Sequence, residues 1–79
     1  MMWTVDLLEK FFNANGVNPM AYAFYSTKED AFSILRDKDL WRIVYVERGE
    51  ENVLGFAESE SQALNMLKLF VLESEKGFK

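Results

Sequence analysis

The side chains that most often carry out chemistry are scarce in this 79-residue chain, which has no histidine and no cysteine. A nucleophilic serine therefore lacks its usual base, and nothing in the sequence positions a lysine to replace it. The four glycines (Gly16, Gly49, Gly55 and Gly77) are too scattered for a phosphate-binding loop. Structural zinc lacks its cysteine and histidine ligands. We therefore expect no enzyme activity, no catalytic residue, no cofactor and no metal.

Carboxylates are the abundant ionisable groups, with 13 Asp and Glu against 9 Lys and Arg. Paired carboxylates do acid–base work only in a cleft, and a chain this short has little room for one. Asp37 and Asp39 flank a polar break, where turn chemistry explains them.

The densest charge lies between residues 47 and 60. The charged residues there are Glu47, Arg48, Glu50, Glu51, Glu58 and Glu60. If the strands on either side of the turn pair as a hairpin, these groups gather at neighbouring ends of the sheet. One interpretation is a solvated turn followed by a helix start that favours anions. The other is a negatively charged face that docks a basic protein, and on this interpretation the six are the candidate partner-binding residues.

Three strands are expected to position these residues. The segment 40–48 is the most strand-like, and its apolar side chains on both faces indicate a central strand. Residues 31–36 predict a strand before it, and residues 53–57 predict one after it, beyond a turn at 49–52. We expect an antiparallel meander whose face away from the helices is exposed.

Helices are expected at both ends of the chain. Residues 4–15 predict the first, with Thr4 as its N-cap and Gly16 just past its end. The last helix opens at Ser59, whose spacing to Gln62 is that of a capping box, and runs to about residue 74.

The apolar arc of the last helix, from Leu64 to Leu72, is wider than a domain this small usually buries. We expect the excess to lie in a homodimer or against a partner, with the core as the third use left open. Between the helix and the strands, Pro19 predicts a short helical turn to about Phe24. This aromatic connector either covers one end of the core or forms an exposed recognition patch.

The fold class that follows is α+β. Residues 1–79 form a single domain in the order N-terminal helix, short helical connector, three-stranded antiparallel meander and C-terminal helix. Both helices pack on one face of the sheet, which gives two layers around one core.

The net charge of −4 and the pI near 4.7 argue against nucleic acid and against an anionic membrane surface as partners. No apolar run approaches the ~20 residues of a membrane-spanning helix, and no signal peptide is visible, so a cytoplasmic location is expected. The acidity favours either solubility or a basic protein partner.

Several of these residues also form a pattern that resembles a family of small immunity proteins from bacterial polymorphic-toxin systems. The pattern is carried by Tyr45-Val46-Glu47-Arg48-Gly49, Leu54, Phe56 and Ser59-Glu60-Ser61-Gln62-Ala63, with Pro19, Ala21-Tyr22 and Asp30-Ala31-Phe32 upstream. The resemblance implies a protein that binds and neutralises a cognate toxin without catalysis. The six charged residues between 47 and 60 are then its contacts.

Two alternatives stay open beside this function. Arg48 can instead have a structural role, pairing with Glu47 or bridging the turn to the last helix. The whole chain can instead be a small phage or host accessory protein that self-associates through its C-terminal helix. Mimicry of nucleic acid is weaker, because five carboxylates are few for a phosphate-like array.

Overall fold

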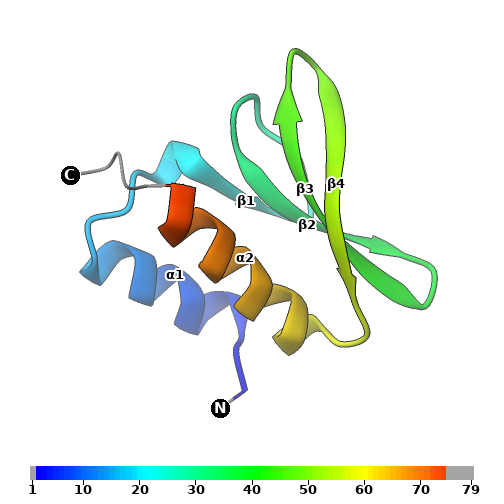
Figure 1. Ribbon diagram of the computed structural model, residues 1–79. Coiled ribbons are helices and arrows are strands. Elements are labelled where there is room, and N and C mark those ends of the chain that lie inside the picture. Colours follow the sequence, from blue (N-terminus) through cyan, green and yellow to red (C-terminus); the bar gives the residue numbers. More distant parts are fainter. Residues whose placement is uncertain (1, 75–79) are drawn as a thin grey trace.

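The computed structural model describes residues 2–74. In chain order its elements are α1 (Val5–Ala14), η1 (Pro19–Ala21), β1 (Tyr22–Phe24), β2 (Phe32–Asp37), β3 (Leu40–Glu47), β4 (Glu50–Ala57) and α2 (Glu60–Ser74) (Figure 1). The strands form one sheet in the order β1-β2-β3-β4. β1 is parallel to β2, and the other neighbours are antiparallel. The α+β class and the two helices are confirmed.

The prediction of three antiparallel strands is wrong, because β1 is a fourth strand and pairs in parallel with β2. The helical turn after Pro19 ends at Ala21, and the chain then extends. A parallel pair usually needs a connection of a dozen residues or more, whereas residues 25–31 suffice here. Positive φ angles at Tyr25 (65°) and Asp30 (61°) let this short segment reverse direction. Three residues are too few for a periodic pattern to reveal the strand.

β4 begins three residues earlier than expected. Arg48 and Gly49 form a two-residue turn with φ angles of 55° and 77°, and Glu47 pairs with Glu50 across it. Positive φ at both positions gives the turn the twist that neighbouring strands need. The predicted turn at 49–52 is therefore too long.

Both helix starts are capped as the sequence predicts. The Oγ1 atom of Thr4 accepts a hydrogen bond from the Leu7 N–H at 3.2 Å. The Oγ atom of Ser59 accepts one from the Gln62 N–H at 3.1 Å, and the Gln62 side chain accepts one from the Glu58 N–H at 3.0 Å. These bonds satisfy N–H groups that have no partner inside the helix.

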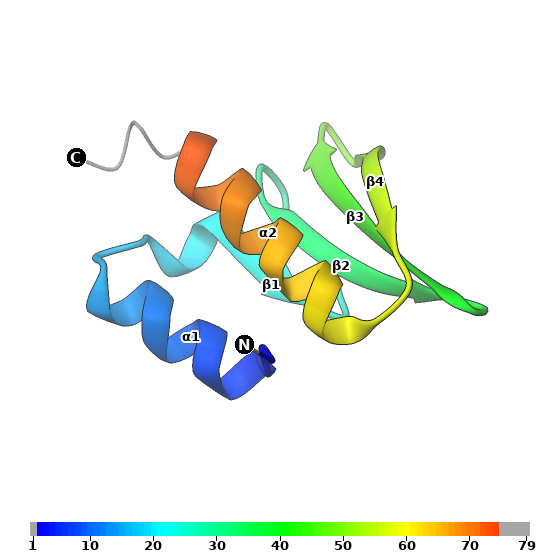
Figure 2. The same cartoon turned by 60° about the horizontal axis from the view of Figure 1, so that its bottom comes forward.

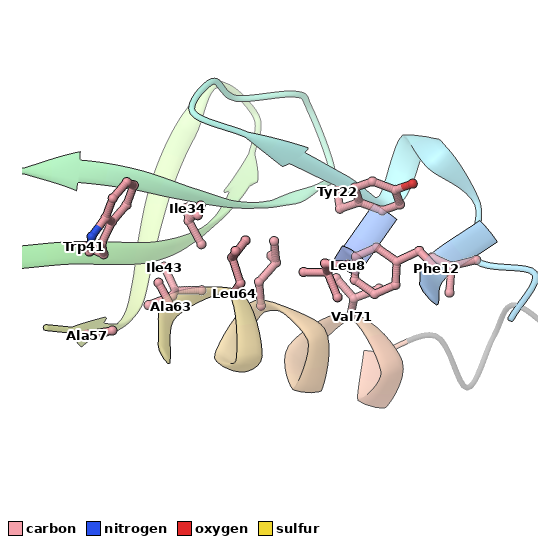
Figure 3. Packing of buried hydrophobic residues seen from close by; sticks show 12 residues of the cluster. Leu8, Phe12, Tyr22, Ile34, Trp41, Ile43, Ala57, Ala63, Leu64 and Val71 are labelled. Carbon is pink, nitrogen blue, oxygen red and sulfur yellow. The ribbon is translucent and has the colours of Figure 1, made fainter. Parts of the chain in front are cut away.

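The helices lie side by side, with α2 on one face of the sheet (Figures 1 and 2). α2 packs against β2, β3 and β4, while α1 packs against α2. Fully buried side chains fill the space between them (Figure 3). They include Leu8, Phe12, Ile34, Ile43, Leu64, Leu67 and Val71. Phe12 reaches β1, where its ring centroid lies 4.5 Å from that of Tyr22.

The expectation that the other sheet face is exposed is wrong for its β2–β3 part. Ser33 and Val44 alternate with the core residues of their strands, yet both are fully buried. The segment 25–31 covers them: the Ser33 hydroxyl donates to the Ser26 carbonyl, and the Asp30 N–H donates to the Val46 carbonyl at 2.8 Å. A connection between neighbouring parallel strands must cross one face of the sheet, and this one crosses the face opposite α2.

Most of the wide apolar arc of α2 is used inside the protein. Four of its residues are buried, and Met66, Phe70 and Leu72 are partly buried against the core. Leu69 is the large apolar side chain of this helix that stays exposed. The aromatic connector divides in a similar way, since Tyr22 is buried and Tyr25 is exposed.

Candidate protein-binding surface

The turn between β3 and β4 is held from outside the hairpin. The carboxylate of Glu29, in the segment after β1, accepts hydrogen bonds from the N–H groups of Arg48 and Gly49, the latter at 3.0 Å. These two bonds fix the conformation of the turn. The residues on either side of it, Glu47 and Glu50, are exposed and lie directly opposite each other. The result is an ordered acidic tip that projects beyond the helices (Figure 1).

Sequence reasoning did not find Glu29, which lies 19 residues before the turn. Glu29 occupies an ordinary polar loop, and no local signal in that loop points to the hairpin. The role appears only when the connection between β1 and β2 brings Glu29 beside Arg48.

Arg48 contributes its backbone rather than its charge. Its N–H donates to Glu29, and within residues 2–74 its guanidinium makes no ion pair. The predicted bridge from Arg48 to the last helix is therefore absent from this part of the chain, because the tip points away from α2 (Figure 1).

Glu51 is paired across the sheet. Its carboxylate lies 2.9 Å from the guanidinium of Arg42, which also lies 3.6 Å from Asp37. Exposed ion pairs of this kind contribute only about 0–1 kcal/mol to stability. The pairing does offset the charge of Glu51, so Glu47 and Glu50 carry most of the negative charge at the tip.

Glu58 and Glu60 lie at the far end of β4. The eight residues of that strand span roughly 23 Å at about 3.3 Å each. The structure therefore brings the six predicted residues together as two groups rather than one. Glu47, Arg48, Glu50 and Glu51 form the tip group, and Glu58 and Glu60 form the helix-start group.

Within the helix-start group, Glu58 is exposed and Glu60 is partly buried. The carboxylate of Glu60 accepts a hydrogen bond from the Tyr25 hydroxyl. This bond, with burial and the charge of Glu60 as smaller causes, raises the pKa of Tyr25 to about 12. Tyr25 thus stays protonated at neutral pH and links the loop after β1 to the start of α2.

Between the two acidic groups, β4 presents apolar side chains to solvent. Val53, Leu54 and Phe56 are 50%, 39% and 53% exposed. A bulge between Ile43 and Val44 of β3 leaves Leu54 without a directly paired residue. Only the end of the strand is covered, where Ala57 is buried. The sequence suggested a strand here but not its exposure, which depends on β4 being last in the sheet.

A groove of about 480 Å³ adjoins β4 on the helix side. It is lined by Ala21, Asp30, Phe32, Tyr45, Asn52, Leu54 and Ser74. Burial raises the pKa of Tyr45, and the nearby carboxylates of Asp30, Glu47 and Glu29 raise it further. The phenol is therefore a neutral hydrogen-bond donor at physiological pH. The arrangement as a whole provides apolar contact area and hydrogen-bonding groups beside negative charge, which suits a protein partner.

Comparisons with known proteins add nothing to this geometry: no family model, no curated protein and no solved structure matches the chain. The resemblance to immunity proteins therefore stays a prediction. Among residues 2–74, no three Asp or Glu side chains are placed to share a metal ion. No helix in the same range has the length and apolarity to cross a bilayer.

Proposed function

We propose that this chain is a non-catalytic protein-binding module that neutralises a cognate bacterial toxin in the cytoplasm, with the β3–β4 hairpin as its binding surface. The observation that carries the proposal is the exposure of Val53, Leu54 and Phe56 on a strand with acidic groups at both ends. Leu54 lies on the helix side of β4, and Val53, opposite Val44, lies on the other face. A long outermost strand with exposed apolar side chains is a ready site for contact with another chain.

The charge indicates the kind of partner. Glu47 and Glu50 at the tip and Glu58 at the other end are exposed. Within residues 2–74, none of the three makes an ion pair. Such charges accelerate the encounter with a basic protein and discriminate against acidic ones, while desolvated apolar contacts supply most of the affinity. A basic toxin, for example a nuclease, fits this division of roles.

Co-expression with the product of the adjacent upstream gene tests the proposal. The expected results are a stable complex and the rescue of growth. In a variant with Glu47→Lys and Glu50→Lys, rescue is expected to fail. A control with Glu9→Lys and Glu73→Lys makes the same change in net charge at exposed positions on the two helices and is expected to rescue growth. No complex and no rescue, or equal rescue by both variants, would count against the proposal.

A second candidate function is self-association through α2, as in a small phage or host accessory protein. Exposure of Leu69 on that helix favours it. Light scattering at micromolar concentration would then show a dimer that Leu69→Lys converts to a monomer, while charge reversal at Glu50 and Glu51 would leave function intact. A monomer for the unaltered chain would exclude this candidate.

A further inference from the structure

The free side of β4 has the geometry of a strand-binding edge. β4 is last in the sheet order, so within residues 2–74 no strand lies on its outer side. Glu47 and Glu50 close the two-residue turn, and Asn52 pairs with Tyr45 two residues further along. Backbone N–H and C=O groups alternate in direction along an antiparallel ladder. The backbone groups of Glu50 and Asn52 therefore point toward β3. Glu51 and Val53 point theirs outward, away from the sheet.

This edge lacks most of the devices that keep an edge from pairing. Proteins commonly protect such strands with charged side chains, above all lysine, or with proline, a bulge, short length or a cover. β4 has eight residues, and its sequence EENVLGFA contains neither lysine nor proline. The bulge at Leu54 is the one irregularity in its pairing. An extended segment can therefore form backbone hydrogen bonds with the first half of the strand and contact Phe56 beyond the bulge.

Charge complementarity identifies the occupant. Glu50 and Glu51 lie at one end of the edge, and Glu58 and Glu60 lie beyond the other. A second copy of β4 in antiparallel pairing would place Glu50 and Glu51 near Glu58. In parallel pairing, each carboxylate would lie near its own equivalent. Like charges oppose pairing in both orientations. A segment with cationic ends avoids this repulsion, because its positive charges lie near the carboxylates of β4 in either orientation.

We propose that the outer edge of β4 accepts an extended segment of the partner protein as a fifth strand, with apolar residues at its centre and Lys or Arg at both ends. This inference rests on the proposed function and names the part of the partner that the module recognises. Main-chain hydrogen bonds to Glu51 and Val53 provide affinity, and the exposed side chains with their acidic flanks provide selectivity.

A synthetic peptide tests the edge without the partner protein. The peptide alternates valine and threonine and carries two lysines at each end, and the readout is amide hydrogen exchange of the ¹⁵N-labelled protein by NMR. At a free peptide concentration about ten times Kd, exchange at Glu51 and Val53 should slow about tenfold. Glu50 and Asn52 already bond to β3, so their exchange should change little. Peptides with glutamate ends, or with proline at the centre, should give no protection.

Two matched variants distinguish binding at the edge of β4 from nonspecific binding to exposed apolar side chains. Phe56 and Leu69 are each 53% exposed, one on β4 and the other on α2. Phe56→Asp should weaken peptide binding about tenfold, since it removes apolar contact area from the edge. Leu69→Asp should leave binding unchanged. Both substitutions are at exposed positions, and the amide spectrum of each variant verifies its fold before titration.

Three results would overturn the inference: no protection at Glu51 and Val53 with millimolar peptide, protection confined to α2 or β1, or equal binding of lysine-ended and glutamate-ended peptides. These failures are distinguishable from failure of the proposed function. Rescue of growth without edge protection would keep the toxin partner and overturn the fifth strand. Edge protection without rescue would keep the strand-binding edge and overturn the toxin assignment.

Discussion

The two edges of the sheet differ in how far the chain closes them. β1 is three residues long, two of its residues are buried, and the Tyr22 ring packs on Phe12 of α1. β4 is eight residues long, and six of its residues are exposed. Both are outermost strands of one sheet. The difference shows that helix α1 covers only the β1 side of the sheet, while β4 has no such cover within residues 2–74.

This asymmetry has an energetic reason. A single core in a chain of this size supplies only about 3–5 kcal/mol of net stability, and no disulfide can add to it. Several of its aromatic contacts lie where α1 and the residue before it meet β1. Strand β4 contributes only Ala57 to the buried core, so most of its side chains stay at the surface.

The largest expected effect is a difference in stability between two substitutions, one on the covered side of the sheet and one on the exposed strand β4. Phe12 is fully buried and Phe56 is mostly exposed. Phe12→Ala should lower the free energy of unfolding by about 3–5 kcal/mol, because it leaves a cavity against Tyr22. Phe56→Ala should change it by no more than about 0.5 kcal/mol. Urea denaturation followed by circular dichroism measures both. Similar losses for the two variants would contradict the division into a closed and an open side.

A smaller effect is expected at the tip of the hairpin. Glu29→Ala removes the acceptor for the Arg48 and Gly49 N–H groups. It should cost about 1 kcal/mol, since hydrogen bonds to a charged group are lost at an exposed site. Hydrogen exchange at these two amides should accelerate. Glu50→Ala, the control in the same turn, should leave both amides unchanged. An unaltered exchange rate at these amides in Glu29→Ala would show that the turn keeps its conformation without the Glu29 carboxylate.

The smallest effect concerns Tyr25, which joins the loop after β1 to α2. Its pKa is raised from 10.0 to about 12 by the hydrogen bond to Glu60, by burial and by the charge of Glu60, so the fold favours the neutral phenol. The stability gained is fully present below pH 10 and is lost as the pH rises through about 12. The stability difference between the unaltered chain and Tyr25→Phe should therefore shrink over that range.

Ultraviolet absorbance and chemical unfolding as functions of pH measure this effect. Glu60→Gln provides the control, since without the carboxylate the pKa of Tyr25 should fall back toward its ordinary value. A stability difference between the unaltered chain and Tyr25→Phe that stays constant from neutral pH to pH 12 would be evidence against the link.

Local patterns were sufficient for much of the fold. Thr4 and Ser59 cap helices where they were expected to, because a cap depends on residues within one turn. β3 is central, because apolar side chains on both faces need cover on both. The candidate residues are exposed or partly buried, and whether they bind a partner stays a prediction.

The remaining features depend on contacts between distant parts of the chain. β1 is too short to show a period, and its parallel pairing depends on a seven-residue segment that no propensity predicts. Glu29 meets the turn 20 residues later only because that segment crosses the sheet. The bulge and the position of β4 at the edge set the exposure of Phe56.

The sequence by itself determined the two helices and their caps, the three longer strands with β3 at the centre, and the acidic character of residues 47–60. The tertiary structure alone decided which edge of the sheet is closed, which carboxylates are paired and how far apart the two acidic groups lie. The physical reason is that periodicity and capping act over a few residues, whereas burial and pairing are set by whichever distant segment packs alongside.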